Sequence, residues 1–253
     1  MEISQHIGAL RDAGRRLSFA AAEAGLDAAV PSCPDWVVRD VVRHQGGVHR
    51  WAAGIVTTPR MEHCDVELDE VVGTWPADAD LLAWFDAGAD ALATALSQAE
   101  PGLACWTFLP APSPLAMWAR RQAHETSIHG VDAELATGRP TAPFPVPFAA
   151  DGVSELLEGF VPRPGQLTAD PARTLRVRCS DAAAGWLVSI GPGGVRTTRS
   201  DGDASGDADC EITGSAEDLY LTLWNRRRPD CLRTAGDGDV LGLFLDRVRI
   251  RWS

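Results

Sequence analysis

The chain has 253 residues, of which 45% are hydrophobic and 23% charged, and its formal net charge is −12 at pH 7. This length suffices for one large domain or two smaller ones, each with its own core. All 23 basic residues are arginine. The negative charge argues against a nucleic-acid partner, because phosphate binding requires a basic surface, although a local group of arginines could still hold a small anion.

Neither a targeting segment nor a membrane span is predicted. Residues 1–26 carry acidic residues and arginines at helical spacing, without the apolar core of a signal peptide. No apolar run approaches the ~18 residues that a membrane helix needs. The cysteines are scattered and form no C-x-x-C pair, which indicates reduced thiols: Cys33, Cys64, Cys105, Cys179, Cys210 and Cys231. We therefore expect a cytoplasmic protein with no membrane partner.

The first half of the chain has the pattern of helices. Apolar residues recur at helical spacing, which predicts helices over 2–26, 36–56, 78–99 and 114–137. Ser32 and Asp35 predict a capping box ahead of the second helix, with Pro34 in its first turn. Gly46 and Gly47 lie inside that helix, where they indicate close helix packing or a cramped site.

Ser113 and Pro114 predict the cap and first residue of the fourth helix, and the sequence TGRP ends it. Four prolines then crowd residues 139–148, which indicates a linker.

Beyond the linker the composition changes to short strands separated by Gly, Asp and Ser. Strands are predicted over 173–180, 185–191, 193–200 and 208–214, followed by a helix over 215–227 capped by Ser215 and a closing strand over 247–252. The fold class is therefore α+β with two domains: a helical bundle over residues 1–145 and a smaller α+β domain over residues 146–253.

One stretch of the fourth helix, RRQAHETSIHGVDAE, resembles the zinc-protease motif H-E-x-x-H. Ile128 stands where that motif requires its second histidine, so the protease interpretation fails. On a helix, Glu125 and His129 lie about 40° apart on one face, whereas His124 lies about 140° from His129. Asp132 continues the stripe of Glu125 and His129 one turn further on.

A metal ion needs a third ligand, for which the sequence offers few candidates. His44 on the second helix faces away from His49, and Asp40 one turn earlier is a candidate acceptor for the His44 imidazole N–H. If the two helices are neighbours, His44 meets Glu125 and His129, and such a set leaves coordination positions open. The alternative is that these are surface or hydrogen-bonded histidines and that the Glu/His pair only stabilises its helix.

Two segments, PSCPDWVVRDVVRHQGGVHRW and RRQAHETSIHGVDAELATG, resemble the two signatures of the mycothiol-dependent maleylpyruvate isomerase family, within the DinB-like metalloenzyme superfamily. The tail, ITGSAEDLYLTLWNRRRP to RVRIRW, is similar to that family's smaller C-terminal domain, which is related to sterol-carrier folds. The resemblance implies a four-helix bundle that holds a divalent ion, usually zinc, through His44, Glu125 and His129. It also implies a monomer.

Further site residues follow from the same resemblance. Asp132 matches an acidic position of the family and is expected to orient a ligand or a bound thiol. An arginine of the C-terminal domain is expected near the site, with Arg226, Arg227 and Arg228 as the nearest run; the alternative is a solvated helix end. The catalytic candidates are thus Asp132, Arg226 and Arg227.

The function implied is a metal-dependent isomerase or S-transferase that uses mycothiol on a small electrophilic substrate. Two alternatives remain at this point. One is a non-catalytic ligand-binding or carrier protein with a structural metal, and the other is a metal-dependent hydrolase. A purely structural zinc site is normally closed by four protein ligands, so a three-ligand set favours an enzyme.

Overall fold

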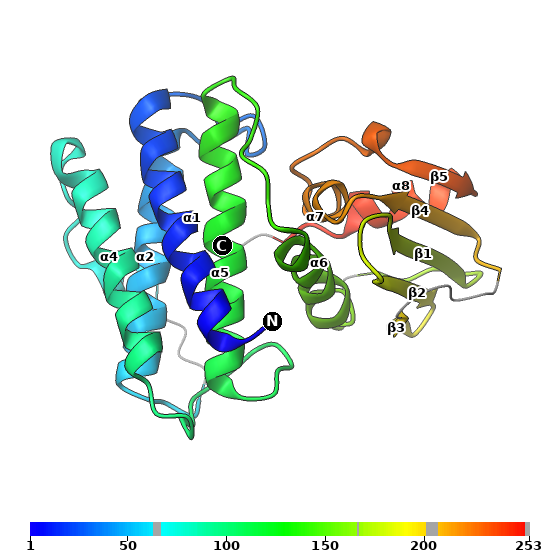
Figure 1. Cartoon of the computed structure of the whole chain (residues 1–253), viewed down its shortest axis with the longest axis horizontal. Coiled ribbons are helices and arrows are strands. Elements are labelled where there is room, and N and C mark those ends of the chain that lie inside the picture. The colour runs from blue at the N-terminus through cyan, green and yellow to red at the C-terminus, as the bar shows by residue number, and fades with distance from the viewer. Residues whose placement is uncertain (63–66, 166, 201–206, 251–253) are drawn as a thin grey trace. The chain divides into compact units, whose positions relative to one another are not determined.

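The computed structural model describes residues 1–62, 67–165, 167–200 and 207–250, which form two compact units, Met1–Ala142 and Pro143–Ser253 (Figure 1). The N-terminal unit is helical, and the C-terminal unit contains a β-sheet with helices. The predicted architecture, a helical bundle followed by an α+β domain, is confirmed. No helix in the described part of the chain is long and apolar enough to cross a membrane.

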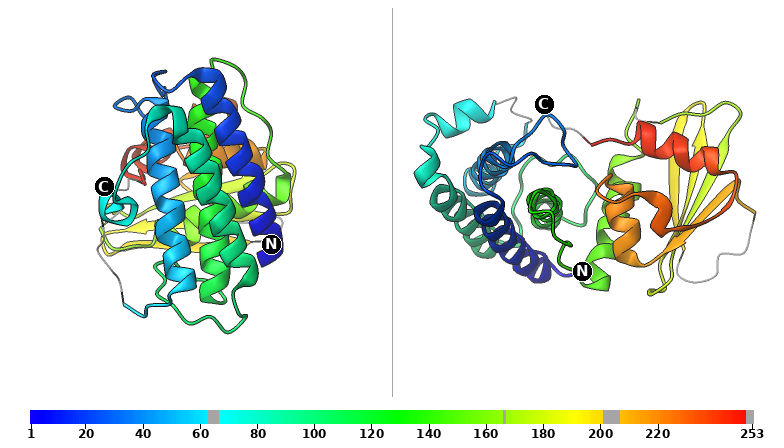
Figure 2. Two further views of the ribbon diagram at one scale, coloured as in Figure 1. Left: turned by 90° about the vertical axis from the view of Figure 1, so that its left-hand side faces the viewer. Right: turned by 90° about the horizontal axis from the view of Figure 1, so that it is seen from above.

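Four long helices build the N-terminal unit, together with one short helix. They are α1 (Ile3–Ala24), α2 (Val38–Thr57), α3 (Leu68–Val72), α4 (Asp78–Gln98) and α5 (Pro114–Ala136). Helices α1 and α2 each pack against both α4 and α5, so the long helices enclose one core (Figure 2). The four predicted long helices are confirmed, with their ends within two residues of the predicted ones.

The bundle core consists of aliphatic and aromatic side chains that face inward at helical spacing. Leu17, Val41, Val42, Leu81 and Phe85 are fully buried in it. Close packing of α2 against α4 explains one of the glycines, because a Cβ at Gly46 would collide with the ring of Trp84. The predicted close helix packing at Gly46 is therefore confirmed.

The helix caps are only partly as predicted. Ser113 Oγ accepts a hydrogen bond from Ala116 N at 3.1 Å, with Pro114 in the first turn, as expected. The predicted capping box of Ser32 and Asp35 is wrong. Helix α2 begins later, at Val38, and Asp40 caps it by accepting a bond from Val37 N at 2.9 Å.

The C-terminal unit begins with a helix and continues into a mixed sheet. Its elements are α6 (Val146–Ser154), η1 (Glu155–Phe160), β1 (Arg173–Cys179), β2 (Gly185–Gly191), β3 (Gly194–Ser200), β4 (Cys210–Gly214), α7 (Ala216–Leu223), η2 (Pro229–Cys231), β5 (Arg233–Gly236) and α8 (Gly238–Arg247). The sheet order is β3-β2-β1-β4-β5, in which only the β1–β4 pair is parallel. Helices α7 and α8 pack against β1 and β4 (Figure 2).

Most of the predicted elements of this unit are present. The four strands from 173 to 214 are confirmed, and Ser215 caps α7 by accepting a bond from Asp218 N. The closing strand predicted over 247–252 is wrong where it is described, because Arg247 ends α8 and residues 248–250 are not in a strand. Residues 251 and 252 lie outside the described part of the chain.

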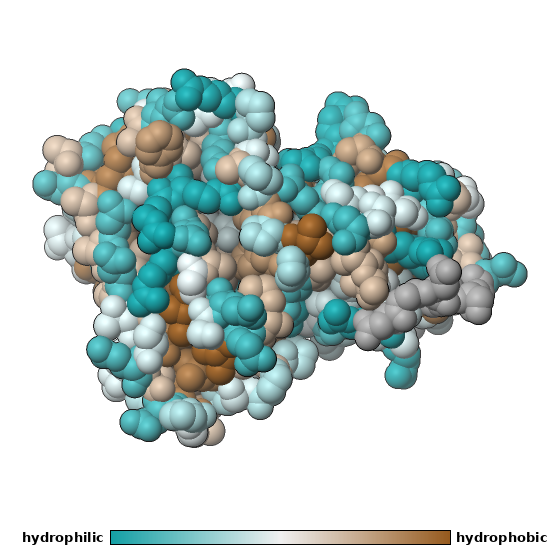
Figure 3. Space-filling model, viewed as in Figure 1, coloured by the Kyte–Doolittle hydropathy of each residue, from teal (hydrophilic) through white to brown (hydrophobic). Residues whose placement is uncertain are grey.

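The face seen in Figure 3 carries both hydrophilic and hydrophobic residues on the two units. In Figure 3, hydrophilic residues are spread over the viewed faces of both units. The large hydrophobic side chains that are exposed among the described residues are scattered: Met1, Phe19, Met61 and Val146. Five cysteines are free thiols, and Cys64 lies outside the described residues.

Candidate metal centre

Helices α2 and α5 bring together the three residues that the sequence singles out. One nitrogen or oxygen atom from each of His44, Glu125 and His129 lies within 4.8 Å of those from the other two. His44 Nε2 is 4.0 Å from Glu125 Oε1, and the rings of His44 and His129 are 5.0 Å apart between centroids. Imidazole, carboxylate and imidazole therefore converge from two distant parts of the sequence.

One ring nitrogen of His44 lacks a hydrogen-bond partner among the described residues. This atom, Nε2, is buried. Burial, followed by the proximity of His129, lowers the pKa of His44 to about 3, so the ring is neutral at ordinary pH. A buried polar atom left unpaired costs about 1–3 kcal/mol. A cation bound by the Nε2 lone pair would remove that cost, and the residues present therefore fit a metal ion.

His129 is oriented by its neighbour one turn along α5. Its Nδ1 lies 2.9 Å from Asp132 Oδ2. Asp132 is fully buried, so its carboxylate contacts protein groups and not water. Because a carboxylate accepts hydrogen bonds, the contact favours the imidazole proton on Nδ1 and a lone pair on Nε2, which is the usual arrangement behind metal-bound histidines.

Glu125 is held through one of its two oxygens. Gln122 Nε2 donates to Oε2 at 3.3 Å, and Arg121 Nε lies 3.5 Å from the same oxygen. Both partners are almost completely buried. The other oxygen, Oε1, faces His44. The carboxylate therefore presents one oxygen towards the two histidines while its second oxygen is anchored on α5.

The loop between α1 and α2 forms a wall of this centre. The ring of Trp36 lies 5.2 Å from that of His44 and stacks on that of His129 at 6.0 Å with an interplanar angle of 16°. From the same loop, Ser32 Oγ donates to Asp132 Oδ1 at 2.5 Å, and Cys33 Sγ lies 3.8 Å from Asp132 Oδ2. Sequence reasoning missed this loop, because it interpreted Ser32 as a helix cap.

Two other polar residues of α2, His49 and Asp40, make hydrogen bonds outside the set of three ligands. His49 Nε2 bonds Thr126 Oγ1 at 2.9 Å, and burial lowers the pKa of His49 to about 3. The predicted separation of His44 from His49 is confirmed. The hydrogen bond that the structure shows for Asp40 goes to the backbone of Val37 and not to His44, so the prediction that Asp40 orients His44 is wrong.

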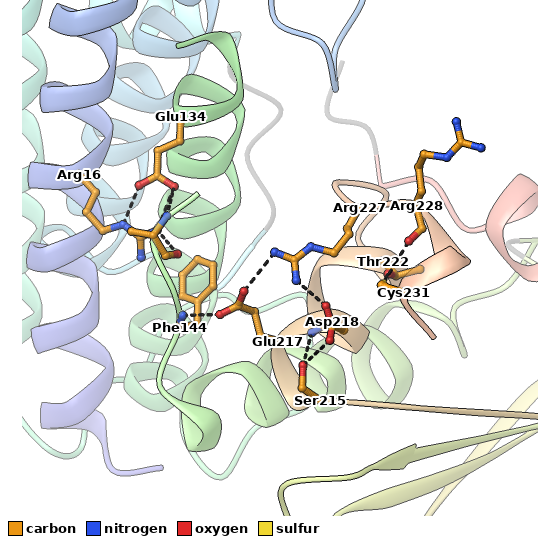
Figure 4. Close-up of polar contacts among 11 residues, drawn as sticks. Arg16, Glu134, Phe144, Ser215, Glu217, Asp218, Thr222, Arg227, Arg228 and Cys231 are labelled. Carbon is orange, nitrogen blue, oxygen red and sulfur yellow. Dashed lines mark hydrogen bonds and ion pairs between the residues drawn. The ribbon is translucent and has the colours of Figure 1, made fainter. Parts of the chain in front are cut away.

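The arginines proposed as catalytic lie in the C-terminal unit just after α7. Arg227 contacts Glu217 at 3.1 Å and Asp218 at 2.5 Å, and Glu217 also accepts a bond from Phe144 N (Figure 4). Arg226 Nη1 donates to Trp224 O at 2.9 Å. Arg227 thus connects the first turn of α7 with the segment that follows the helix, which gives it a structural role in this unit.

Comparison with known proteins adds two family models and a group of solved structures. The model described as "Mycothiol maleylpyruvate isomerase N-terminal domain" matches residues 7–134, and the model described as "MDMPI C-terminal domain" matches residues 147–243. No curated protein matches the chain significantly.

Two crystal structures of mycothiol-dependent maleylpyruvate isomerase align over 93% of this chain and 93% of their own. One, a histidine-to-alanine mutant, has a TM-score of 0.63 at 12% identity, and the other has a TM-score of 0.60 at 13% identity. At this identity the likeness establishes the two-domain fold.

Proposed function

The chain belongs to the mycothiol maleylpyruvate isomerase family, and from this premise we propose that it is a metal- and thiol-dependent enzyme. His44, Glu125 and His129 hold a divalent ion, with zinc as the first choice. A low-molecular-weight thiol, mycothiol, is the cosubstrate, and the reaction is isomerisation or S-conjugation of a small electrophile. The observation that carries the proposal is the buried Nε2 of His44, which lies beside Glu125 and His129 and has no hydrogen-bond partner in the part of the chain that the structure describes.

The set of three ligands supports an enzyme rather than a structural site. Structural zinc is normally bound by four protein ligands, whereas catalytic zinc has three and an open position. The ion would supply Lewis-acid chemistry, chiefly by lowering the pKa of a bound thiol, which is about 8.5 in water. Asp132 keeps the proton of His129 on Nδ1, and Arg121 and Gln122 hold Glu125 at Oε2.

Three further side chains have proposed roles in this function. The indole of Trp36 stacks on the ring of His129 and lies at a tilt 5.2 Å from that of His44, where it would limit the access of water to the two rings. Arg226 and Arg227 remain proposed contacts for an anionic group of the substrate, because guanidinium groups bind carboxylates through paired hydrogen bonds. For Arg227 this role requires that it exchange its bonds with Glu217 and Asp218 for the substrate.

Metal content tests the ligand assignment. Purified wild-type protein should contain close to one equivalent of divalent metal, and both His44→Ala and Glu125→Ala should lose most of it. Asp90→Ala removes an exposed carboxylate of α4 and serves as the control that should keep its metal. Unchanged metal content in both ligand variants would show that the ion, if any, is held elsewhere.

The thiol tests the chemistry. Addition of mycothiol or a simpler thiol to the cobalt-substituted protein should produce a sulfur-to-cobalt charge-transfer band in the near ultraviolet. A protein that binds cobalt but gives no such band would not activate thiols, and the hydrolase or carrier alternatives would then be preferred.

A further inference from the structure

We propose that Ser32 is a positioning residue for His129, acting through Asp132; this inference rests on the proposed metal centre. Ser32 lies in the loop between α1 and α2, a hundred positions before Asp132 in the sequence. Its hydroxyl donates to Asp132 Oδ1 at 2.5 Å, while the other oxygen of the same carboxylate contacts His129 Nδ1 at 2.9 Å. The chain of contacts therefore runs from the loop through a carboxylate to a metal-binding ring.

The Ser32 hydroxyl matters for the orientation of the Asp132 carboxylate because Asp132 is buried. A fully buried carboxylate is stable only when hydrogen-bond donors surround it, and each of its oxygens is directed by the donor that it accepts from. With Ser32 fixing Oδ1, the carboxylate plane is set and Oδ2 is left to face the imidazole. Without the hydroxyl, Oδ1 loses the donor from this loop, and the carboxylate is held less firmly about its terminal torsion, which is a soft one.

The loop itself is built to hold Ser32 in place. Its backbone closes on itself through bonds from Val30 N to Trp36 O at 3.0 Å, from Cys33 N to Val30 O at 3.0 Å and from Trp36 N to Cys33 O at 2.8 Å. The same loop carries Trp36, whose ring stacks on His129. Ser32 and Trp36 thus restrain His129 from a single rigid turn, one through the carboxylate and the other on the ring face.

The test compares two β-branched substitutions of equal size. Ser32→Thr keeps the hydroxyl, and Ser32→Val replaces it with a methyl group. Removal of an outer-shell partner costs about 10–100-fold in metal affinity, and we expect Ser32→Val to lie at about tenfold because it acts one bond further from the ligand. Ser32→Thr should bind within about threefold of wild type. Asp35→Ala, an exposed position of the same loop, is the control for general disturbance of the loop.

Affinity is measured for Co²⁺ and Zn²⁺ by competition with a chromophoric chelator, together with the visible spectrum of the cobalt protein and the melting temperature of the metal-free protein. A changed cobalt spectrum and weaker binding in Ser32→Val alone support the proposal. Equal affinities and spectra in both variants overturn it, and so does a Ser32→Val protein that loses melting temperature but not affinity, since Ser32 would then be merely structural.

The outcome is separable from that of the proposed function. A wild-type protein that binds metal but does not bind a thiol contradicts the proposed chemistry and leaves the comparison at Ser32 decisive. A wild-type protein that binds no metal overturns the role of Ser32 as well, because His129 would then not be a ligand.

Discussion

Replacement of Asp132 by asparagine probes how the candidate metal centre depends on a single buried contact. Asp132 Oδ2 lies 2.9 Å from His129 Nδ1 and is completely shielded from solvent. Asparagine has the same shape but no charge, and its NH2 group is able to face Nδ1 and donate to it. The imidazole proton would then move to Nε2, the nitrogen that has to bind the ion, and metal binding would require that the side chain turn back.

The expected loss follows from the position of the contact. Outer-shell partners of metal-bound histidines contribute about 10–100-fold to affinity, which corresponds to about 1.4–2.7 kcal/mol. Because Asp132 is fully buried and water cannot replace it, we expect Asp132→Asn to lie towards the upper end of this range. The assay is competition between the protein and a chromophoric chelator for Zn²⁺ at constant pH.

The chain offers a matched control on the same helix. Glu134 also loses one negative charge when it is replaced by glutamine, but its carboxylate contacts Arg16 at 3.0 Å (Figure 4), and none of the three ligands is among the partners of this carboxylate in the described part of the chain. Glu134→Gln should therefore bind zinc like the wild type. If Asp132→Asn also binds zinc within about twofold of wild type while it remains folded, the assigned role of Asp132 is wrong.

Three further predictions concern stability and need no metal. Gly46→Ala should lower the free energy of unfolding by about 1–3 kcal/mol, because its Cβ meets the ring of Trp84, whereas Gly54→Ala, with open space on the same helix, should raise it by up to about 1 kcal/mol; urea titration of both checks this. The pKa of His49 falls from 6.5 in the unfolded chain to about 3 in the folded one, so the stability that it contributes is complete above pH 6.5 and decreases as the pH falls towards 3. The metal-free protein should therefore lose about 2 kcal/mol between pH 7.5 and pH 5 from this residue alone, and a His49→Gln variant that shows the same loss would contradict the assignment. Trp118→Ala should cost about 3–5 kcal/mol in chemical unfolding, since the ring is fully buried; a loss below 1 kcal/mol would refute its role in the core.

Much of the fold was readable because its signals are local. The helix of Glu125 and His129 has a serine cap and a proline in its first turn, and both act as expected. Strands β1 to β4 are short runs bounded by turn residues, and they appear where composition predicts them, whereas β5 was not predicted. The capping box of Ser32 and Asp35 was predicted wrongly because Ser32 has the chemistry of a cap, and nothing in its neighbourhood in the sequence reveals a distant carboxylate.

The residues around the candidate centre were harder to find than its ligands. Glu125 and His129 share a face by helical spacing alone. For the second helix, spacing shows only that one of His44 and His49 should face a common site, and the family resemblance singles out His44. The contacts of Ser32 and Trp36 depend on how a loop folds back over α5, and no periodic pattern encodes such a path. The prediction of a closing strand was wrong for a related reason. Residues 247–250 alternate in polarity as a strand does, but they follow directly on α8 and do not pair with the sheet.

The parallel pairing of β1 with β4 has a consequence for how the C-terminal unit is made. Leu175 lies opposite Cys210, so one edge of β1 obtains its partner only after about 35 more residues have been synthesised. During that interval the nascent chain carries an uncovered row of amide and carbonyl groups, which is a template for aggregation. A variant of this chain that ends before residue 210 lacks β4 and leaves that edge of β1 without its partner. Such variants should be insoluble even though their helical bundle, Met1–Ala142, is complete.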